Sequence, residues 1–184
     1  MLAVRPSELG ALRCETFACI WNITLTNVLF VCTGNICRSP TAEGVFRTTV
    51  ERAGMQSSII IDSAGTHDYH LGSPPDPRAV YAAALRGYDI AGLRARRVSR
   101  QDFAQFDWVL AMDRANLRVL EKLKPASYHG NLALFLDLAP GMAGREVPDP
   151  YCGGAEDFTR VIDLVEIASE ALLERVSKAL PRQR

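Results

Sequence analysis

The sequence contains no apolar stretch approaching the roughly 20 residues that a membrane-spanning helix needs, so we expect no membrane association. It has no excess of charge of either sign: 21 Lys and Arg face 21 Asp and Glu, which gives no support to a general nucleic-acid binder. Internal repeats, low-complexity tracts and linkers are also absent. The 184 residues suffice for one well-buried domain, and 48% apolar residues are typical of a globular protein.

Cysteine is scarce, and its pattern excludes two classes of protein. An odd count is not the pattern of a secreted disulfide scaffold; the five are Cys14, Cys19, Cys32, Cys37 and Cys152. No cluster of Cys and His has the spacing of a structural zinc site, so we expect no metal and no cofactor. Glu8 and Glu15 interrupt the N-terminal segment, which makes it a poor signal peptide. We therefore expect a cytoplasmic protein.

Short apolar runs alternate with segments of helical period. Strands are expected at residues 27–31, 58–62, 106–112 and 132–136, and helices at 39–54, 76–87, 113–123 and 156–180. Such alternation predicts an α/β fold: a three-layer α/β/α sandwich with a central four-stranded parallel sheet, flavodoxin/Rossmann-like. Residues 27–181 are expected to form this single domain, preceded by a poorly ordered extension, residues 1–26.

The junction between the first strand and the first helix carries the chemistry. Cys32 follows the strand, and Arg38 comes six positions later, where Ser39 as N-cap and Pro40 mark the helix start. Ligands bind at the carboxyl ends of strands in open α/β sheets, and a helix N-terminus offers N–H groups and a positive dipole to an anion. Gly34 can adopt backbone angles that help the loop close. The junction predicts a phosphate-binding loop after the first strand.

The positive end of the helix dipole and the neighbouring Arg38 also favour the thiolate form of Cys32 at neutral pH. A thiolate in an anion-binding loop can attack phosphorus in line, while the backbone amides and the two-pronged guanidinium of Arg38 hold the equatorial oxygens. The alternative is a buried cysteine that acts as a small hydrophobe. It leaves Arg38 unexplained, since the helix dipole disfavours a cation there unless an anion joins it. The pattern therefore favours phosphate-ester chemistry.

Residues 32–40 closely resemble the signature of the low-molecular-weight protein tyrosine phosphatases. Further segments resemble the family in the same order, over about residues 26–180: 62–66, 75–79, 102–107, 111–113 and 149–151. The resemblance implies hydrolysis of phosphotyrosine through a cysteinyl-phosphate intermediate, without a metal. Cys32 would be the nucleophile, Arg38 the phosphate clamp and Asp149 the general acid. Pro150 keeps Asp149 away from helical backbone angles.

The resemblance assigns roles to further residues. The phosphate would be bound by Thr33, Gly34, Asn35, Ile36, Cys37, Arg38 and Ser39. Asn35, Ser39 and Ser63 would support the loop, and Ser39 would donate a hydrogen bond to the thiolate. Leu93 stands where many relatives have a histidine paired with an aspartate, and Asp113 is retained, so we expect an incomplete outer network and a less rigid loop.

The substrate cleft and a redox function also follow from the resemblance. Tyr69, His70 and Tyr151 would line the cleft, with a flat aryl phosphate between the aromatic rings. Cys152 stands where many relatives have a second tyrosine. Cys37 would form a reversible disulfide with Cys32 under peroxide; its alternative role is packing. The expected partner of this monomer is a tyrosine-phosphorylated protein such as a tyrosine kinase, and phosphoarginine stays open as a substrate.

Three other functions are weighed against this one. Some arsenate reductases share the fold and the cysteine loop, but they need two further cysteines in the middle of the chain, and none lies between Cys37 and Cys152. A non-catalytic phosphotyrosine-binding module would be expected to lack Cys32, Arg38 or Asp149, and all three are present. A nucleotide-binding switch would need GxxxxGK[ST], which does not occur.

Overall fold

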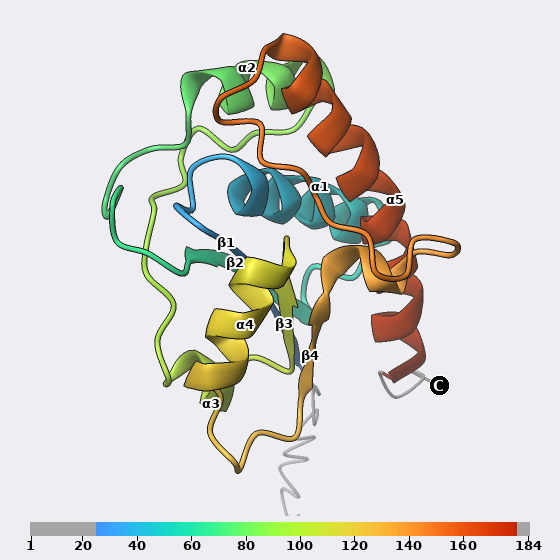
Figure 1. The fold of residues 1–184 in the computed structure, drawn as a ribbon. Helices are drawn as coiled ribbons and strands as arrows, with labels where there is room; N and C mark the ends of the chain where they lie inside the picture. Colours follow the sequence, from blue (N-terminus) through green and yellow to red (C-terminus); the bar gives the residue numbers. More distant parts are fainter. Residues whose placement is uncertain (1–24, 180–184) are drawn as a thin grey trace, which may run out of the picture.

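The computed structural model describes residues 25–179, whose course is shown in Figure 1. The strands are β1 (Thr26–Cys32), β2 (Ile59–Gly65), β3 (Trp108–Ala111) and β4 (Asn131–Leu134). The helices are α1 (Arg38–Arg52), α2 (Pro77–Leu85), α3 (Asp102–Gln105), α4 (Arg114–Leu123) and α5 (Ala155–Ala179), with a 3-10 turn at Phe135–Leu138. Most of the predicted extension lies outside the described residues, and Thr26 already pairs with Ile59 in the sheet.

The four strands form one parallel sheet in the order β2-β1-β3-β4, as the predicted fold class requires. In the central strand β1, residues 28–31 are fully buried because neighbouring strands and helical layers surround them. The edge strand β2 differs from the buried strand that we predicted, because Ile60 is 47% exposed. An edge strand lacks a neighbouring strand on one side, so part of its surface stays exposed to solvent.

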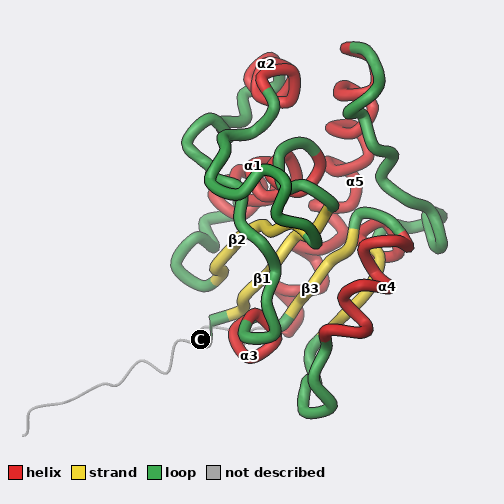
Figure 2. Tube along the Cα trace, turned by 60° about the vertical axis from the view of Figure 1, so that its left-hand side comes forward, coloured by secondary structure: helices red, strands yellow, loops and turns green. Residues whose placement is uncertain are grey.

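Helices cover both faces of the sheet, which confirms the three-layer arrangement (Figure 2). Val28 and Phe30 point into one core, packed against α1 and α5 through residues such as Phe46 and Ile162. Leu29 and Val31, of opposite orientation in the strand, belong to a second core with residues of α3 and α4, among them Phe103 and Leu120. Within residues 25–179, no helix is long and apolar enough to cross a bilayer.

Element boundaries differ from the predictions where tertiary contacts compete with local patterns. Helix α1 begins at Arg38, with Cys37 at the N-cap position and without a side-chain cap; Ser39 does not cap the helix. Its hydroxyl is used elsewhere, as described below. The predicted strand at 132–136 ends at Leu134, where a 3-10 turn begins, and the short helix α3 was not predicted. The helix over residues 76–87 is confirmed, with Asp76 capping α2.

Candidate active site

A pocket opens at the carboxyl end of β1, where the chain enters α1. It is lined by Cys32, Thr33, Gly34, Ile36, Cys37, Arg38, Tyr69, His70, Asp149 and Tyr151. These ten are residues that the sequence assigned to the nucleophile, the phosphate loop, the general acid and the substrate cleft. The three predicted supporting residues, Asn35, Ser39 and Ser63, are buried behind it. One pocket therefore gathers segments that are separated by more than a hundred residues.

The backbone of the loop wraps around the sulfur of Cys32. Asn35 has φ 55°, a left-handed conformation that asparagine tolerates better than most residues, and its N–H donates to Cys32 Sγ at 3.2 Å. The unusual backbone angle thus belongs to Asn35; Gly34, to which we had assigned it, has no positive φ. A Cβ at position 34 would lie 3.0 Å from the His70 ring, so a larger residue there would require that ring to move by a few tenths of an ångström.

A hydrogen-bond network behind the loop converges on the nucleophile. The side-chain amide of Asn35 donates to Ser39 Oγ and to Ser63 Oγ, both at 2.9 Å, while its oxygen accepts the Arg96 N–H at 2.9 Å. Ser39 Oγ in turn donates to Cys32 Sγ at 3.0 Å. The polar groups of the Asn35 amide are therefore all engaged, which holds the left-handed turn of the loop in place.

Glu43, a residue of α1 that we did not single out, ends this network. Its side chain is buried and accepts the Ser63 hydroxyl at 2.6 Å, and Arg47 forms an ion pair with it. Burial raises the pKa of Glu43, an effect that the contacts with Ser63 and Arg47 oppose. Leu93 packs against the core instead. The outer network that we expected to be incomplete is therefore supplied by Glu43 and the backbone of Arg96.

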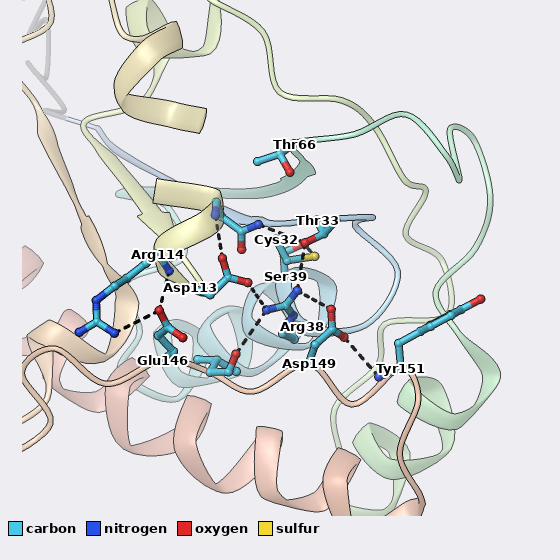
Figure 3. Close-up of polar contacts among 12 residues, drawn as sticks. Cys32, Thr33, Arg38, Ser39, Thr66, Asp113, Arg114, Glu146, Asp149 and Tyr151 are labelled. Carbon is cyan, nitrogen blue, oxygen red and sulfur yellow. Dashed lines mark hydrogen bonds and ion pairs between the residues drawn. The ribbon is translucent and has the colours of Figure 1, made fainter. Parts of the chain in front are cut away.

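Arg38 is only 2% exposed and bridges three segments (Figure 3). Its Nη1 donates to Asp113 Oδ2 at 2.6 Å and its Nη2 to Asp149 Oδ2 at 2.6 Å; Thr33 Oγ1 and the Val147 carbonyl accept weaker hydrogen bonds. Burial lowers the pKa of Arg38, but Cys32, Asp149 and Asp113 raise it by more. The guanidinium thus remains a fixed cation in the pocket.

Asp113, which we noted only as retained although Leu93 replaces the histidine, contacts the phosphate clamp. It pairs with Arg38, not with a histidine, and its Oδ1 also caps α4 by accepting the Asn116 N–H at 2.7 Å. The sequence held a signal for the contact with Arg38, because Asp113 follows a strand at the same sheet edge as Cys32.

The rim of the pocket is aromatic. Tyr151 is 50% exposed, and its ring centroid lies 6.3 Å from that of His70. The ring of Tyr69 stacks on the ring of His67, with 5.0 Å between the two centroids. Asp149, whose side chain is half exposed, accepts the Tyr151 N–H at 3.2 Å. The acidic side chain is thus located between the guanidinium at the pocket floor and the aromatic rim.

Cys37 lines the pocket but is largely buried, and Cys152 on the adjacent loop is exposed. Burial raises the pKa of Cys37 to about 12, with Asp76 and Cys32 contributing in the same direction. Cys37 is therefore a neutral thiol near neutral pH.

Known proteins resemble this chain over most of its length. The family model described as low molecular weight phosphotyrosine protein phosphatase matches residues 27–182. A protein of that name from Schizosaccharomyces pombe is 45% identical over 132 residues, covering 71% of this chain and 84% of the relative. A crystal structure of a protein tyrosine phosphatase from Entamoeba histolytica, with Hepes in the active site, superposes with a TM-score of 0.80 at 38% identity, covering 84% and 98% of the two chains. A Drosophila arginine phosphatase is also similar, with a TM-score of 0.76 at 29% identity, covering 81% and 96%. The chain belongs to the low molecular weight phosphotyrosine protein phosphatase family.

Proposed function

We propose that this protein hydrolyses the phosphotyrosine of phosphorylated proteins by double displacement, with Cys32 as nucleophile, Arg38 as phosphate clamp and Asp149 as general acid. One observation carries the proposal: Cys32 Sγ accepts hydrogen bonds from the Asn35 N–H and the Ser39 hydroxyl, in a pocket that also holds Arg38 and Asp149. Donors aimed at a sulfur favour its negative form, and a cation beside it favours a dianionic substrate.

In the first step the Cys32 thiolate attacks phosphorus, an S–P bond forms and the bond to the phenolic oxygen breaks. Arg38 Nη2 exchanges Asp149 for a phosphoryl oxygen, since its 2.6 Å contact with that carboxylate occupies the donor that the substrate needs. Asp149, which takes up a proton from solvent when it leaves Arg38, then gives that proton to the departing phenolic oxygen. The Asp113 contact at 2.6 Å keeps the guanidinium in place during this exchange.

In the second step water attacks the cysteinyl phosphate. Asp149, now a carboxylate, removes a proton from that water, the S–P bond breaks, and inorganic phosphate and the Cys32 thiolate are released. The Ser39 hydroxyl, 3.0 Å from Cys32 Sγ, stabilises the negative charge that returns to sulfur. In this proposal neither displacement requires a metal or a cofactor.

The rim suggests an aromatic substrate. A flat phenyl ring fits against Tyr151 and Tyr69 by stacking, and His70 adds a third wall. A tyrosine-phosphorylated protein, such as a tyrosine kinase, is the partner that we propose. We propose that the enzyme acts as a monomer, since the proposed mechanism needs no residue beyond those of this pocket. A free thiolate also needs a reducing compartment, which is the reason to propose the cytoplasm.

A phosphatase assay with p-nitrophenyl phosphate and EDTA at mildly acidic pH tests the mechanism. We expect no turnover by Cys32→Ser, and for Asp149→Ala a loss of about 10²–10⁴-fold, which is what a general acid contributes. Full activity in Cys32→Ser, or activity that EDTA abolishes, would contradict the proposal. Phosphotyrosine and phosphoarginine are then compared directly, because a similar structure is named an arginine phosphatase. Faster hydrolysis of phosphoarginine would overturn the substrate assignment.

We propose a redox role for Cys37, which is buried beside the nucleophile. Peroxide oxidises the Cys32 thiolate to a sulfenic acid, and the Cys37 thiol then displaces water to form a disulfide that a thiol reductant reverses. Oxidation also removes the charge of Cys32, one of the causes that keep Cys37 protonated. Mass spectrometry after peroxide should find this disulfide. A Cys37→Ala variant that recovers as fully as the parent would exclude the role.

A further inference from the structure

Arg78, in the first turn of α2, connects the loop that carries Asp149 to the loop that carries Cys32. We propose that Arg78 is a positioning residue: it fixes the acid loop, residues 149–154, so that Asp149 meets the oxygen of the leaving group. The inference rests on the proposed function and deepens it. It assigns no contact between Arg78 and the substrate.

On the acid-loop side, the guanidinium of Arg78 holds two carbonyl groups of one turn. Its Nη2 donates to the Tyr151 carbonyl at 3.0 Å and its Nη1 to the Gly153 carbonyl at 3.4 Å. The turn between them is closed by the Gly153 N–H, which donates to the Pro150 carbonyl at 2.9 Å. The guanidinium also lies 5.7 Å from the centroid of the Tyr151 ring and 4.8 Å from that of Phe158. Arg78 thus contacts both the backbone of the loop and its aromatic wall.

On the other side, Arg78 is held by Asp76, the N-cap of α2. The Asp76 carboxylate accepts Arg78 Nε at 3.0 Å, Nη2 at 2.8 Å and the backbone N–H at 2.8 Å. The Asp76 N–H donates to the carbonyl of Ile36, in the phosphate loop, at 2.8 Å. The hydrogen bonds from Arg78 lower the pKa of Asp76, so the carboxylate stays charged. A two-pronged pair of this kind has little freedom to rotate.

These contacts matter most when substrate is bound. The Asp149 carboxylate contacts Arg38 Nη2 and the Tyr151 N–H. Once a phosphoryl oxygen takes Arg38 Nη2, the loop backbone decides where Asp149 lies. That backbone is anchored before Asp149 by the Val147 N–H, which donates to the Met112 carbonyl at 2.8 Å, and after it by Arg78. A misplacement of about 1 Å can cost roughly 10²-fold in rate, so the second anchor affects catalysis.

The leaving group distinguishes an acid-positioning residue from a merely structural one. p-Nitrophenolate is a better leaving group than phenolate, so its departure depends less on a proton from the general acid. For Arg78→Met we expect kcat/KM to fall about tenfold more on phenyl phosphate than on p-nitrophenyl phosphate, a part of the general-acid contribution. Inhibition by inorganic phosphate should stay within about twofold, because Arg38 and the loop amides are untouched. Arg78→Lys keeps the charge but not the two-pronged geometry and should shift the ratio in the same direction.

Arg86→Met is the matched control. Arg86 follows α2 at its other end and pairs with Asp163 and Glu166 of α5, so its loss weakens the same helix without touching the acid loop. The proposal would be overturned if folded Arg78→Met kept the parent's ratio of kcat/KM between the two substrates, or if Arg86→Met changed that ratio equally. It would also be overturned if Arg78→Met lost phosphate binding and lost activity equally on both substrates. If Arg78→Met does not fold, Arg78→Lys decides by the same ratio. Failure of the proposed function itself would be seen separately, as a parent that is inactive or a Cys32→Ser variant that is active.

Discussion

Removal of the Asp113 carboxylate should destabilise the fold and weaken phosphate binding together. The side chains of Arg38 and Asp113 are only 3% and 18% exposed, and their 2.6 Å contact is a charged hydrogen bond. Loss of such a bond costs about 1.5–3 kcal/mol. Loss of the cap on α4, the 2.7 Å contact with Asn116, costs about 1 kcal/mol. Asp149, Thr33 and the Val147 carbonyl still contact the guanidinium, so Asp113→Ala should lower the free energy of unfolding by about 3 kcal/mol.

Asp113→Asn separates the two contributions. Asparagine is a good N-cap and retains an acceptor oxygen, so it should lose only the charged part of the contact, about 1–2 kcal/mol. Urea unfolding in a phosphate-free buffer measures both variants, since bound phosphate would stabilise the native state by mass action. The inhibition constant for inorganic phosphate reports whether Arg38 keeps its orientation, and it should rise in both variants.

Asp163→Ala is the control for this experiment. Its partner Arg86 and Asp163 itself are 39% and 52% exposed, so the pair should contribute no more than about 1 kcal/mol. An Asp113→Ala variant as stable as Asp163→Ala would refute the reasoning about the buried pair. Equal losses for Asp113→Ala and Asp113→Asn would instead show that neither the cap nor an uncharged acceptor for Arg38 contributes to stability.

Three further predictions concern the loop and its surroundings. Gly65→Ala would place a Cβ 2.8 Å from the Thr33 carbonyl, so we expect a loss of about 1–3 kcal/mol in urea unfolding together with reduced phosphatase activity; a fully active, equally stable variant contradicts this. Because burial raises the pKa of Glu43, that residue makes the folded parent less stable as pH rises through this pKa, and glutamine does not titrate. Glu43→Gln should therefore gain stability relative to the parent as pH rises above the range in which an unburied glutamate titrates, and a difference independent of pH argues against it. Because its pKa is raised to about 12, the Cys37 thiol should resist iodoacetamide at neutral pH in the native protein, whereas the exposed Cys152 should be labelled. Peptide mass mapping measures both, and early labelling of Cys37 would disprove the assignment.

Several elements were predictable because they depend on near neighbours in the chain. The apolar run at 27–31 became the buried centre of the sheet, and Asp76 before Pro77 capped a helix as such pairs do. The errors arose where a distant partner competes for the same group. Ser39 was read as a helix cap, but its hydroxyl donates to Cys32 Sγ at 3.0 Å, with the Ala64 carbonyl as a more distant alternative acceptor at 3.3 Å.

The amino-acid sequence by itself determined the alternation of strands and helices, the cysteine at a strand end and the arginine at a helix start. Spacing, capping and backbone preference act over a few residues, so they can be read without a fold. The tertiary structure decided which groups meet there. Asp113 and Asp149 lie 75 and 111 residues from Arg38 along the chain, and Glu43 is connected to Cys32 through Ser63, Asn35 and Ser39. Cys32 and Asp113 reach the same site because β1 and β3 are parallel neighbours whose carboxyl ends lie at one edge, and the Val147 N–H joins the loop of Asp149 to Met112 at that edge.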